Sequence, residues 1–329
     1  MTLHDLVAAV RRLHEQLRAA AIAAGERLGP EDLSTVAGDV EGDTVYALDT
    51  VTMAPLVDFF EREIVPHGPV VLIAEGLRGG RLVLPARASE PDARWCVIVD
   101  PIDGTRGLMY QKRSGWILTG IAPNRGAATG LHHVEAAVQT EIPVTKQHLA
   151  DAVWATREEG VQAERWNRMT GERTPLALQP SRAGTLGHGF ATVARFFPGR
   201  RDVLAAIDDE VVASVVGPSQ EGKAACFEDQ YISSGGQLYE LMSGRDRFIA
   251  DIRPLVYGRG SPLCCHPYDV CTELLARGLG VIITDERGRQ LSAPLDIDAN
   301  VSWVGYANAE IRRVVEPAFQ RALQSRGLL

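Results

Sequence analysis

The chain has little that would place it in a membrane or on a nucleic acid. Its 329 residues contain no apolar run close to the roughly 20 residues that a bilayer-spanning helix needs. The N-terminal segment mixes charged with apolar side chains and lacks the continuous apolar core of a signal peptide, so we expect a cytoplasmic protein. The net charge is −8 and no basic block occurs, which makes nucleic acid and anionic membrane surfaces poor partners.

Cysteine is also scarce, and the five residues present are an odd number, which argues against a disulfide framework. Cys264, Cys265 and Cys271 surround Asp269, but their spacing matches no structural zinc pattern, so we expect buried thiols. No Gly-x-Gly-x-x-Gly follows a predicted strand, which excludes an NAD-binding enzyme of the usual kind.

The composition is that of an ordinary globular protein, with 45% apolar and 23% charged residues. A Ser/Gly/Thr-rich connection at 179–189 predicts two lobes, an N-terminal α+β lobe over 1–180 and a C-terminal α/β lobe over 181–329. Periodicity predicts strands at 69–74, 95–100, 115–122, 132–142, 150–156, 247–251, 280–284 and 301–306. It predicts helices at 3–27, 53–64, 202–216, 234–242, 269–277 and 308–326, and an irregular segment at 253–264.

The stretch from Trp95 to Tyr110 carries the clearest chemical signal. Its β-branched run has the length of a buried strand, and we expect that strand to stop at Asp100 because Pro101 removes a backbone donor. Two carboxylates, Asp100 and Asp103, therefore lie at the strand end.

Gly104 and Thr105 follow these acids, and their N–H groups can face outward. Carboxylates that hold a hard cation beside amides that hold an anion suit metal-assisted phosphate chemistry. An ordinary alternative is a hairpin turn, or a helix cap formed by Asp103. An EF-hand is a poorer match because no Glu closes the pattern.

The Asp-Pro-Ile-Asp-Gly-Thr segment at 100–105 also resembles the signature of the inositol monophosphatase family of magnesium-dependent, lithium-sensitive phosphatases. Three further segments appear in the family's order. Residues 42–49 are similar to its Asp-x-Val-Thr-x-x-Asp segment, 73–76 to Ile-Gly-Glu-Glu, and 267–270 to Trp-Asp-x-Ala. The resemblance spans about residues 40 to 290.

This resemblance implies a fold and a metal site. The fold is mixed α+β and α/β, a layered α/β/α/β/α sugar-phosphatase sandwich with two lobes. The site holds two or three Mg²⁺ ions, whose implied ligands are Glu75, Asp100, the Ile102 carbonyl, Asp103 and Asp269. Without the resemblance, the ordinary interpretation of Glu75 is a solvent-exposed acid of a loop, and that of Asp269 is the N-cap of a helix.

The family also implies roles beside the metals. The catalytic group comprises Glu75, Thr105 and Asp49: the Thr105 hydroxyl, held near Glu75, orients a water, and Asp49 helps to hold a third, weaker ion. Phosphate oxygens bind at Asp103 and at the amides of Gly104 and Thr105.

Substrate contacts are expected at two positions where the sequence departs from the family. Arg106 can bind extra substrate charge, although a solvated basic face is the ordinary alternative. The family's polyol-binding acid falls near Asp251, just before the 253–264 insertion. Gly76 replaces the second Glu of the Glu-Glu pair, and Tyr268 replaces the usual Trp.

The sequence therefore predicts a Mg²⁺-dependent phosphomonoesterase that hydrolyses a small phosphorylated polyol or sugar by in-line attack of a metal-activated water. Within the family, a 3′,5′-bisphosphate nucleotidase and a fructose-1,6-bisphosphatase are the alternatives, and a homodimer is common. From another class, a catalytically silent binding protein with the same fold remains an alternative. The complete ligand set argues against silence.

Overall fold

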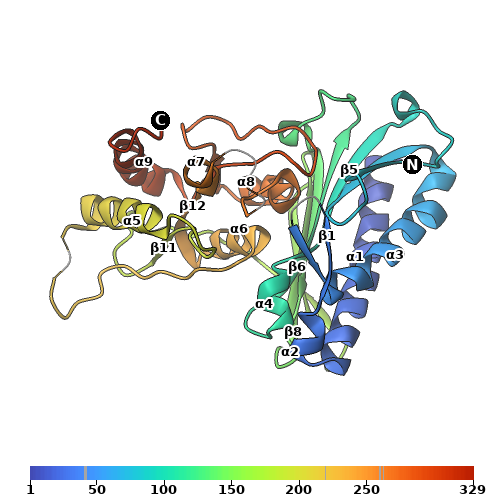
Figure 1. Ribbon diagram of the computed structural model, residues 1–329, viewed down its shortest axis with the longest axis horizontal. Coiled ribbons are helices and arrows are strands. Elements are labelled where there is room, and N and C mark those ends of the chain that lie inside the picture. Colours follow the sequence, from blue (N-terminus) through green and yellow to red (C-terminus); the bar gives the residue numbers. More distant parts are fainter. Residues whose placement is uncertain (41–42, 219, 259–260, 262) are drawn as a thin grey trace.

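The computed structural model describes residues 1–40, 43–218, 220–258, 261 and 263–329. Within this part of the chain, helices and two sheets form five layers (Figure 1). Two helices cover the outer face of a large sheet, a second helical layer separates it from a small sheet, and further helices close the other side. The predicted α/β/α/β/α sandwich is thus confirmed. None of the described helices is both long and apolar enough to cross a bilayer.

The large sheet has eight strands in the order β10-β9-β8-β7-β6-β5-β3-β4. All neighbours are antiparallel except β3 and β5, which run parallel. The strands are β3 (Val70–Ala74), β4 (Arg81–Leu84), β5 (Trp95–Asp103), β6 (Gly115–Pro123), β7 (Ala136–Ile142), β8 (Leu149–Thr156), β9 (Gly160–Asn167) and β10 (Arg173–Pro175). The sequence missed β4, β9 and β10, which are short or only partly buried and so lack a strong apolar pattern.

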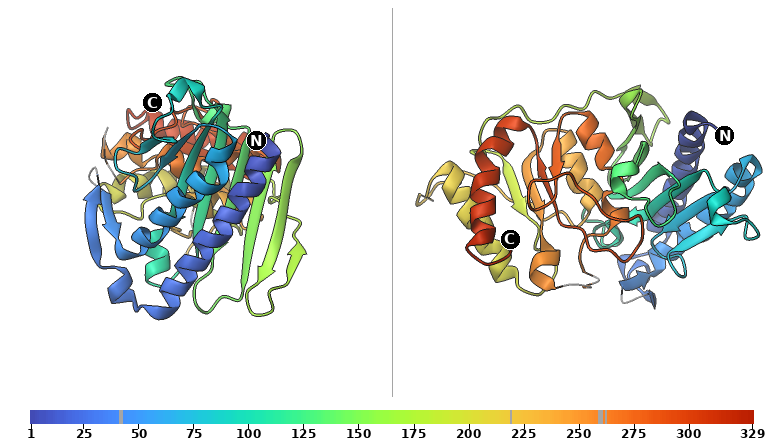
Figure 2. Two further views of the ribbon diagram at one scale, coloured as in Figure 1. Left: turned by 90° about the vertical axis from the view of Figure 1, so that its right-hand side faces the viewer. Right: turned by 90° about the horizontal axis from the view of Figure 1, so that it is seen from above.

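The outer helices α1 (Leu3–Arg27) and α3 (Ala47–Phe59) lie along one face of this sheet (Figure 2, left). The predicted bounds of α1 are correct. The predicted start of the second helix at residue 53 is wrong, because Asp49 Oδ2 accepts the Tyr46 N–H at 2.8 Å and caps a helix that begins at Ala47. The helix continues into a π-helical turn at Phe60–Ile64.

The small sheet has the order β11-β12-β14-β13, with β11 and β12 parallel. Its strands are β11 (Phe190–Val193), β12 (Asp246–Asp251), β13 (Ile282–Thr284) and β14 (Trp303–Tyr306). Helices α6 (Ser234–Met242) and α8 (Glu273–Gly278) lie between the sheets, and α5 (Arg201–Val216) and α9 (Ala309–Gln324) cover the outer side (Figures 1 and 2). Three apolar cores hold the layers together: one under α1 and α3, one around α6 and α8 between the two sheets, and one under α5 and α9.

Shorter elements complete the chain. Helix α2 (Pro30–Leu33) precedes a hairpin of β1 (Val36–Val40) and β2 (Asp43–Tyr46). The remaining helical turns are α4 (Thr105–Met109), α7 (Arg253–Tyr257), Val65–His67, Glu90–Asp92, Leu131–His133 and η5 (Pro267–Val270). The segment 253–264, which was predicted to be irregular, thus begins with α7, and its residues 259, 260 and 262 lie outside the described residues. Gly42, the first residue of the family-like segment 42–49, also lies outside them. The large sheet ends at Pro175 and the small sheet begins at Phe190. The division into lobes at 180/181 stays a prediction.

β5 does not end at Asp100 as predicted. It continues to Asp103 through an irregularity, since Asp100 pairs with Leu118 while Asp103 pairs with Trp116. Two residues of β5, Pro101 and Ile102, therefore lie opposite the single residue Ile117 of β6, which is a β-bulge at the proline. A bulge redirects side chains, and here it brings both acids to the same end of the sheet.

A buried histidine joins α1 to the large sheet. His14 is fully buried, and its ring nitrogens lie 2.9 Å from Thr140 Oγ1 and 2.8 Å from Thr119 Oγ1. Burial, together with the charge of Arg18, lowers the pKa of His14 to about 3. The native protein therefore holds His14 neutral, whereas the unfolded chain protonates it below pH 6.5.

We expect this histidine to make stability fall with pH. Between pH 6.5 and about 3 the unfolded state binds the extra proton, so this group lowers the free energy of unfolding by up to about 1.4 kcal/mol per pH unit as pH falls. His14→Gln should flatten the dependence measured by urea unfolding at pH 4.5 to 7. His4→Gln, on the exposed face of the same helix, should leave it unchanged. Equal slopes in wild type and His14→Gln would contradict this assignment.

Candidate metal centre

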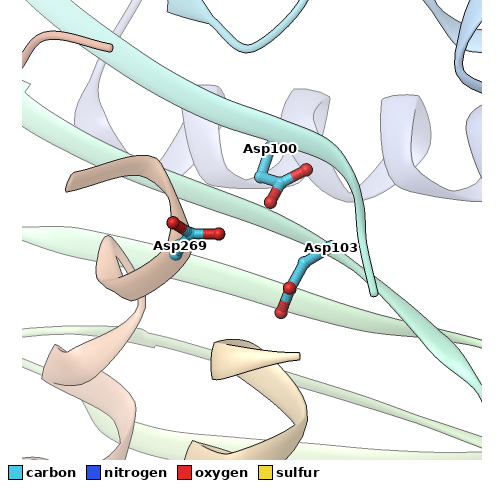
Figure 3. A group of neighbouring side chains, drawn as sticks. All are labelled: Asp100, Asp103 and Asp269. Atoms are coloured by element: carbon cyan, nitrogen blue, oxygen red, sulfur yellow. The ribbon is translucent and has the colours of Figure 1, made fainter. Parts of the chain in front are cut away.

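Three aspartates from distant parts of the chain meet at the end of β5. Asp100 and Asp103 come from the bulge, and Asp269 comes from the turn η5 (Figure 3). One carboxylate oxygen from each lies within 4.8 Å of the others. Asp269 is fixed in its turn because its Oδ2 accepts the His266 N–H at 2.6 Å. The predicted ligands Asp100, Asp103 and Asp269 are therefore brought together.

Glu75 approaches this group from the neighbouring strand. It follows β3 directly. Because β3 and β5 are parallel neighbours, Glu75 and Asp100 lie at the same end of these two strands. The Glu75 N–H donates to the Val99 carbonyl at 3.3 Å, and the residue lines the same cleft as the aspartates. It is not one of the three residues whose oxygens lie within 4.8 Å.

The three aspartates oppose one another electrostatically. Burial, and then the charges of Glu75, Asp103 and Asp269, raise the pKa of Asp100 well above its ordinary value. Burial and Asp269 raise the pKa of Asp103 to about 8, against hydrogen bonds from Ser233 and Gly235. Burial raises the pKa of Asp269 to about 6. A cluster with this much uncompensated negative charge favours a bound cation.

The donor chemistry of the cluster fits a hard divalent ion. Its groups are carboxylates, which Mg²⁺ and similar cations prefer, and they converge from two separate elements. Cys264, Cys265 and Cys271 are free and buried, as predicted, and burial raises the pKa of each thiol, that of Cys264 to about 11. Among the described residues, the group whose ligand atoms lie close enough to share a metal ion consists of aspartates and contains none of these cysteines.

Asp103 is held by the N-terminal end of α6. Its Oδ2 accepts the Ser233 hydroxyl at 2.8 Å and the Gly235 N–H at 2.6 Å. A Cβ at Gly235 would lie 2.5 Å from Leu118 and 2.8 Å from Asp103 Oδ2, so this close approach requires glycine. Sequence reasoning missed Ser233 and Gly235. The signal was the Ser-Ser-Gly-Gly run at the start of an amphipathic helix.

Thr105 bonds to a different acid from the one expected. Its Oγ1 lies 2.8 Å from Asp49 Oδ1 and 2.8 Å from the Ile102 carbonyl, so its proton is directed to one of these acceptors. The sequence placed this hydroxyl near Glu75. The capped start of α3 instead brings Asp49 over Thr105, while the Ile102 carbonyl faces the same hydroxyl.

Gly104 makes the turn from β5 into α4 possible. It has φ +84°, a left-handed conformation that side chains disfavour, and a Cβ there would lie 3.0 Å from Ser233 Cβ. Gly104 and Thr105 line the cleft next to the aspartates, so the predicted phosphate-binding residues and the acids share one cavity.

Arginine and phenylalanine form the other wall of the cleft. The Arg106 guanidinium stacks over Tyr46 at 5.6 Å and over Phe197 at 4.9 Å. Arg253 stacks over Phe196 at 4.2 Å. The cleft is lined by Glu75, Asp100, Ile102, Asp103, Gly104, Thr105, Arg106, Phe196, Phe197, Ile232, Ser233, Ser234, Arg253, Cys264, His266, Tyr268 and Asp269.

Asp251 is not where the sequence suggested. It is 0% exposed and does not line the cleft. Its carboxylate is bound on both oxygens by Arg253, with Nε 2.8 Å from Oδ1 and Nη2 2.5 Å from Oδ2. Arg253 Nη1 also donates to the Leu263 carbonyl at 2.6 Å. The residue that reaches the cleft is therefore Arg253, and Asp251 holds it in place.

The fold resembles known phosphatase structures at low sequence identity. Leishmania major fructose-1,6-bisphosphatase in its holo form matches with a TM-score of 0.68 and 12% identity, covering 98% of this chain and 96% of that one. The MJ0109 gene product, an inositol monophosphatase–fructose 1,6-bisphosphatase, matches at 0.65 and 16%, covering 97% and 100%. The extragenic suppressor protein SuhB from Bartonella henselae matches at 0.62 and 15%, covering 96% and 98%.

No protein-family model matches the sequence, and no curated protein matches it either. The structural matches, at 12–16% identity, show the fold alone: the chain has the same layered sandwich as these three structures, which is the fold that the sequence resemblance implied. Within this fold, Asp100, Asp103 and Asp269 form an acidic cluster that could hold a metal ion.

Removing one acid should stabilise the metal-free protein and abolish its response to metal. Two unit charges 4.8 Å apart repel by roughly 3 kcal/mol at an effective dielectric constant of 20, partly relieved by protonation. We expect Asp269→Asn, which can still accept the His266 N–H, to raise the free energy of unfolding in EDTA by about 1 kcal/mol.

The same variant should lose the rise in Tm that millimolar Mg²⁺ or Mn²⁺ gives the wild type by binding the native state. Thermal unfolding with and without metal measures both effects. Asp209→Asn, which removes an exposed acid from α5, is the control and should behave as wild type. An equal metal-induced shift in Asp269→Asn and wild type would show that the aspartates do not hold the ion.

Proposed function

We propose that the protein is a metal-dependent phosphomonoesterase that hydrolyses a small phosphorylated polyol or sugar. The observation that carries this proposal is the convergence of Asp100, Asp103 and Asp269 beside Gly104 and Thr105 in one cleft. Magnesium is the ion we propose, because the donors are hard oxygens and the resembled family uses it. Divalent cations bound there would act as Lewis acids and make a bound water more acidic.

The chain's own residues supply the remaining steps. The Thr105 hydroxyl donates its one proton to Asp49 or to the Ile102 carbonyl, which leaves an oxygen lone pair to accept a hydrogen bond from the attacking water and to aim that water at phosphorus. Asp49 is itself fixed by the Tyr46 N–H. This direct attack by water needs no side-chain nucleophile.

The turn after β5 binds the phosphate group of the substrate. The backbone at Gly104 and Thr105 lines the cleft next to the aspartates, and amide donors there can hold phosphate oxygens. Ser233 and Gly235 keep Asp103 in place while the substrate binds. Lithium sensitivity, a homodimer and a cytoplasmic location belong to the same proposal, because they come from the family resemblance and the sequence composition.

Asp100→Asn should lower phosphate release by about 1,000-fold or more, because loss of a metal ligand removes several kcal/mol of transition-state stabilisation. The measurement is the rate of phosphate release from inositol, sugar, nucleotide and histidinol phosphates in the presence of Mg²⁺, with and without lithium. Asp92→Asn, an acid of a surface turn, is the control and should keep full activity. Wild-type turnover in Asp100→Asn would show that Asp100 is not part of the active site. Absence of turnover on every substrate of the panel would favour the alternative of a catalytically silent binding protein.

A second candidate substrate carries two phosphates, as for a bisphosphate nucleotidase or fructose-1,6-bisphosphatase. Two guanidiniums, Arg106 and Arg253, lie in the cleft against Phe196 and Phe197. Asp251, the acid that a polyol would need, is bound to Arg253 instead. The charge of Arg253 is offset by Asp251, so the Arg106 guanidinium beside Phe197 is the group that favours a second anionic group over an uncharged ring.

Arg106→Ala should therefore weaken kcat/KM for a bisphosphate about tenfold or more, and for a monophosphate of the same sugar by less than threefold. The contrast arises because only the bisphosphate has a charge that reaches the outer wall. Arg94→Ala, which removes an arginine stacked on Trp95 outside the cleft, controls for loss of a surface charge. Equal losses on both substrates would exclude Arg106 from recognition of a second phosphate.

A further inference from the structure

A buried glutamine in the large sheet contacts both of the elements that bring Asp103 and Asp269 together. Gln139 lies on β7, two strands away from β5, and is fully buried. Its surroundings are apolar, because Ala137 on the same face of β7 and its partner Leu118 on β6 belong to the core around α6 and α8. A side-chain amide in such surroundings is costly unless it is hydrogen-bonded, so its partners show what it holds.

The two ends of the Gln139 amide bond to groups from different elements. Its Nε2 donates to the Gly235 carbonyl at 2.7 Å, and its Oε1 accepts the Thr272 hydroxyl at 2.9 Å. A carbonyl can only accept, so the Gly235 carbonyl fixes which end of the amide is the nitrogen. Thr272 is fully buried as well. One side chain of the large sheet therefore joins the first turn of α6 to the start of α8.

Each partner of this amide is close in the chain to a group of the acidic cluster. The N–H of the same Gly235 donates to Asp103 Oδ2 at 2.6 Å. Thr272 follows Asp269 by three residues, in the stretch that leads from η5 into α8. Gln139 thus bonds the element that holds Asp103 to the element that carries Asp269.

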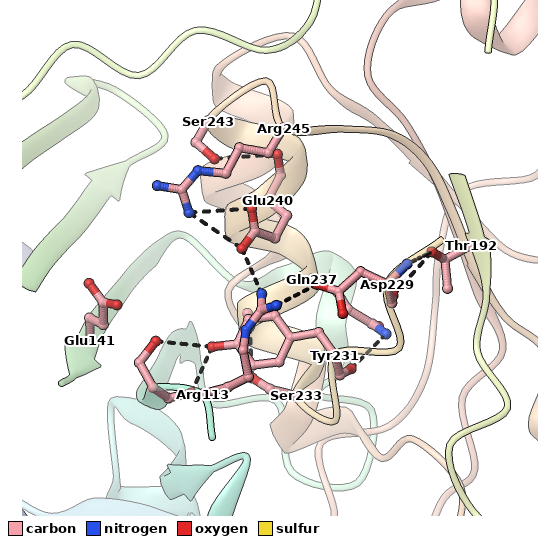
Figure 4. A network of polar contacts seen from close by, with 12 residues as sticks. Arg113, Glu141, Thr192, Asp229, Tyr231, Ser233, Gln237, Glu240, Ser243 and Arg245 are labelled. Atoms are coloured by element: carbon pink, nitrogen blue, oxygen red, sulfur yellow. Dashed lines mark hydrogen bonds and ion pairs between the residues drawn. The ribbon is translucent and has the colours of Figure 1, made fainter. Parts of the chain in front are cut away.

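Helix α6 is also braced along its length (Figure 4). Gln237 Nε2 donates to the Tyr231 carbonyl at 3.0 Å, and Arg113 Nη2 donates to Glu240 Oε1 at 3.0 Å. These bonds join α6 to the segment before it and to the segment that follows α4. They do not reach η5 or α8, and the Gln139 amide supplies bonds that do.

Close packing fixes the height of both elements above the large sheet. A Cβ at Gly235 would lie 2.5 Å from Leu118, and a Cβ at Gly120 of β6 would lie 2.9 Å from the Cys271 carbonyl. Neither element can therefore come nearer to the sheet. Their spacing along the sheet is a separate matter, because apolar contacts are non-directional whereas hydrogen bonds allow only a narrow range of length and angle. Gln139 supplies two such bonds across this spacing.

We propose that Gln139 is a positioning residue that sets the separation of Asp103 and Asp269, and thereby the affinity and selectivity of the centre for a divalent ion. The inference rests on the metal centre of the proposed function and not on phosphate release. The two carboxylates repel each other without a cation, and a bond between their elements opposes their separation. Mg²⁺ needs near-octahedral oxygens at about 2.0–2.1 Å, whereas Ca²⁺ accepts irregular ligand sets at about 2.3–2.6 Å. Loss of the amide should therefore weaken Mg²⁺ binding more than Ca²⁺ binding.

The test measures ion binding by the full chain instead of turnover. The electron paramagnetic resonance signal of free Mn²⁺ reports binding, and Mg²⁺ and Ca²⁺ are titrated as competitors. Gln139→Met keeps the length of the side chain without its amide, and should weaken Mg²⁺ binding about tenfold or more and Ca²⁺ binding less than about threefold. Thr272→Val removes one of the two bonds and should weaken Mg²⁺ binding about threefold or more. Thr272→Ser keeps the hydroxyl and should bind both ions as wild type does.

The next residue of the same strand separates this role from a general loss of stability. Thr140 is buried, and its Oγ1 lies 2.9 Å from Nδ1 of His14 on α1, so it serves the opposite face of the large sheet. Thr140→Val removes this buried contact and should lower Tm, but it should leave the affinities for Mg²⁺ and Ca²⁺ unchanged. Circular dichroism at the temperature of the titration shows whether each variant is folded.

A preferential loss of Mg²⁺ binding in Gln139→Met and Thr272→Val, with Thr140→Val as wild type, supports the proposal. Wild-type Mg²⁺ affinity in folded Gln139→Met, equal losses for Mg²⁺ and Ca²⁺, or the same loss in Thr140→Val would overturn it. If Gln139→Met does not fold, Thr272→Val decides by the same criteria. A wild type that binds no divalent ion overturns this inference together with the metal centre. A wild type that binds Mg²⁺ but releases no phosphate overturns the phosphatase proposal alone.

Discussion

The candidate site depends on three aspartates, two buried and one half-buried, that the fold brings together against their mutual repulsion. Asp100 and Asp103 are turned to one end of the large sheet by the β5 bulge, and Asp269 meets them from η5. Neutral donors offset part of this cost, since Ser233 and Gly235 both donate to Asp103. The rest of the cost is what a divalent cation would remove. The acidic cluster thus lowers the stability of the metal-free protein and is the basis of its proposed chemistry.

The layers explain how residues so distant in sequence reach one cleft. The parallel pair β3 and β5 delivers Glu75 and Asp100 to the same edge of the large sheet. The central helix α6 then approaches that edge closely because glycine occupies position 235. The small sheet contributes the opposite wall, where β12 ends in Asp251 and the chain turns back through Arg253. The cleft is therefore lined by residues that follow strands of both sheets and by residues of α6 and η5.

Much of this arrangement could be predicted from sequence where the signal is local. The β-branched run before Asp100 and the amphipathic pattern of α1 predicted a central strand and an outer helix, and the family-like segments predicted the layers. The interactions that depend on tertiary approach could not be predicted. The Thr105 hydroxyl lies within hydrogen-bond distance of Asp49 because α3 begins earlier than its periodicity suggests. The Arg253 guanidinium binds the Asp251 carboxylate because α7 follows β12 directly in the chain. Ser233 carries no local mark of its bond to Asp103.

The central claim is that Asp100, Asp103 and Asp269 together hold a divalent ion. The most direct measurement is the anomalous difference density of crystals grown with Mn²⁺, recorded at the manganese edge. We expect a peak within coordination distance of the carboxylates of all three aspartates. Crystals that hold Mn²⁺ only at other sites, or that show the three carboxylates without an ion at saturating Mn²⁺, would contradict it.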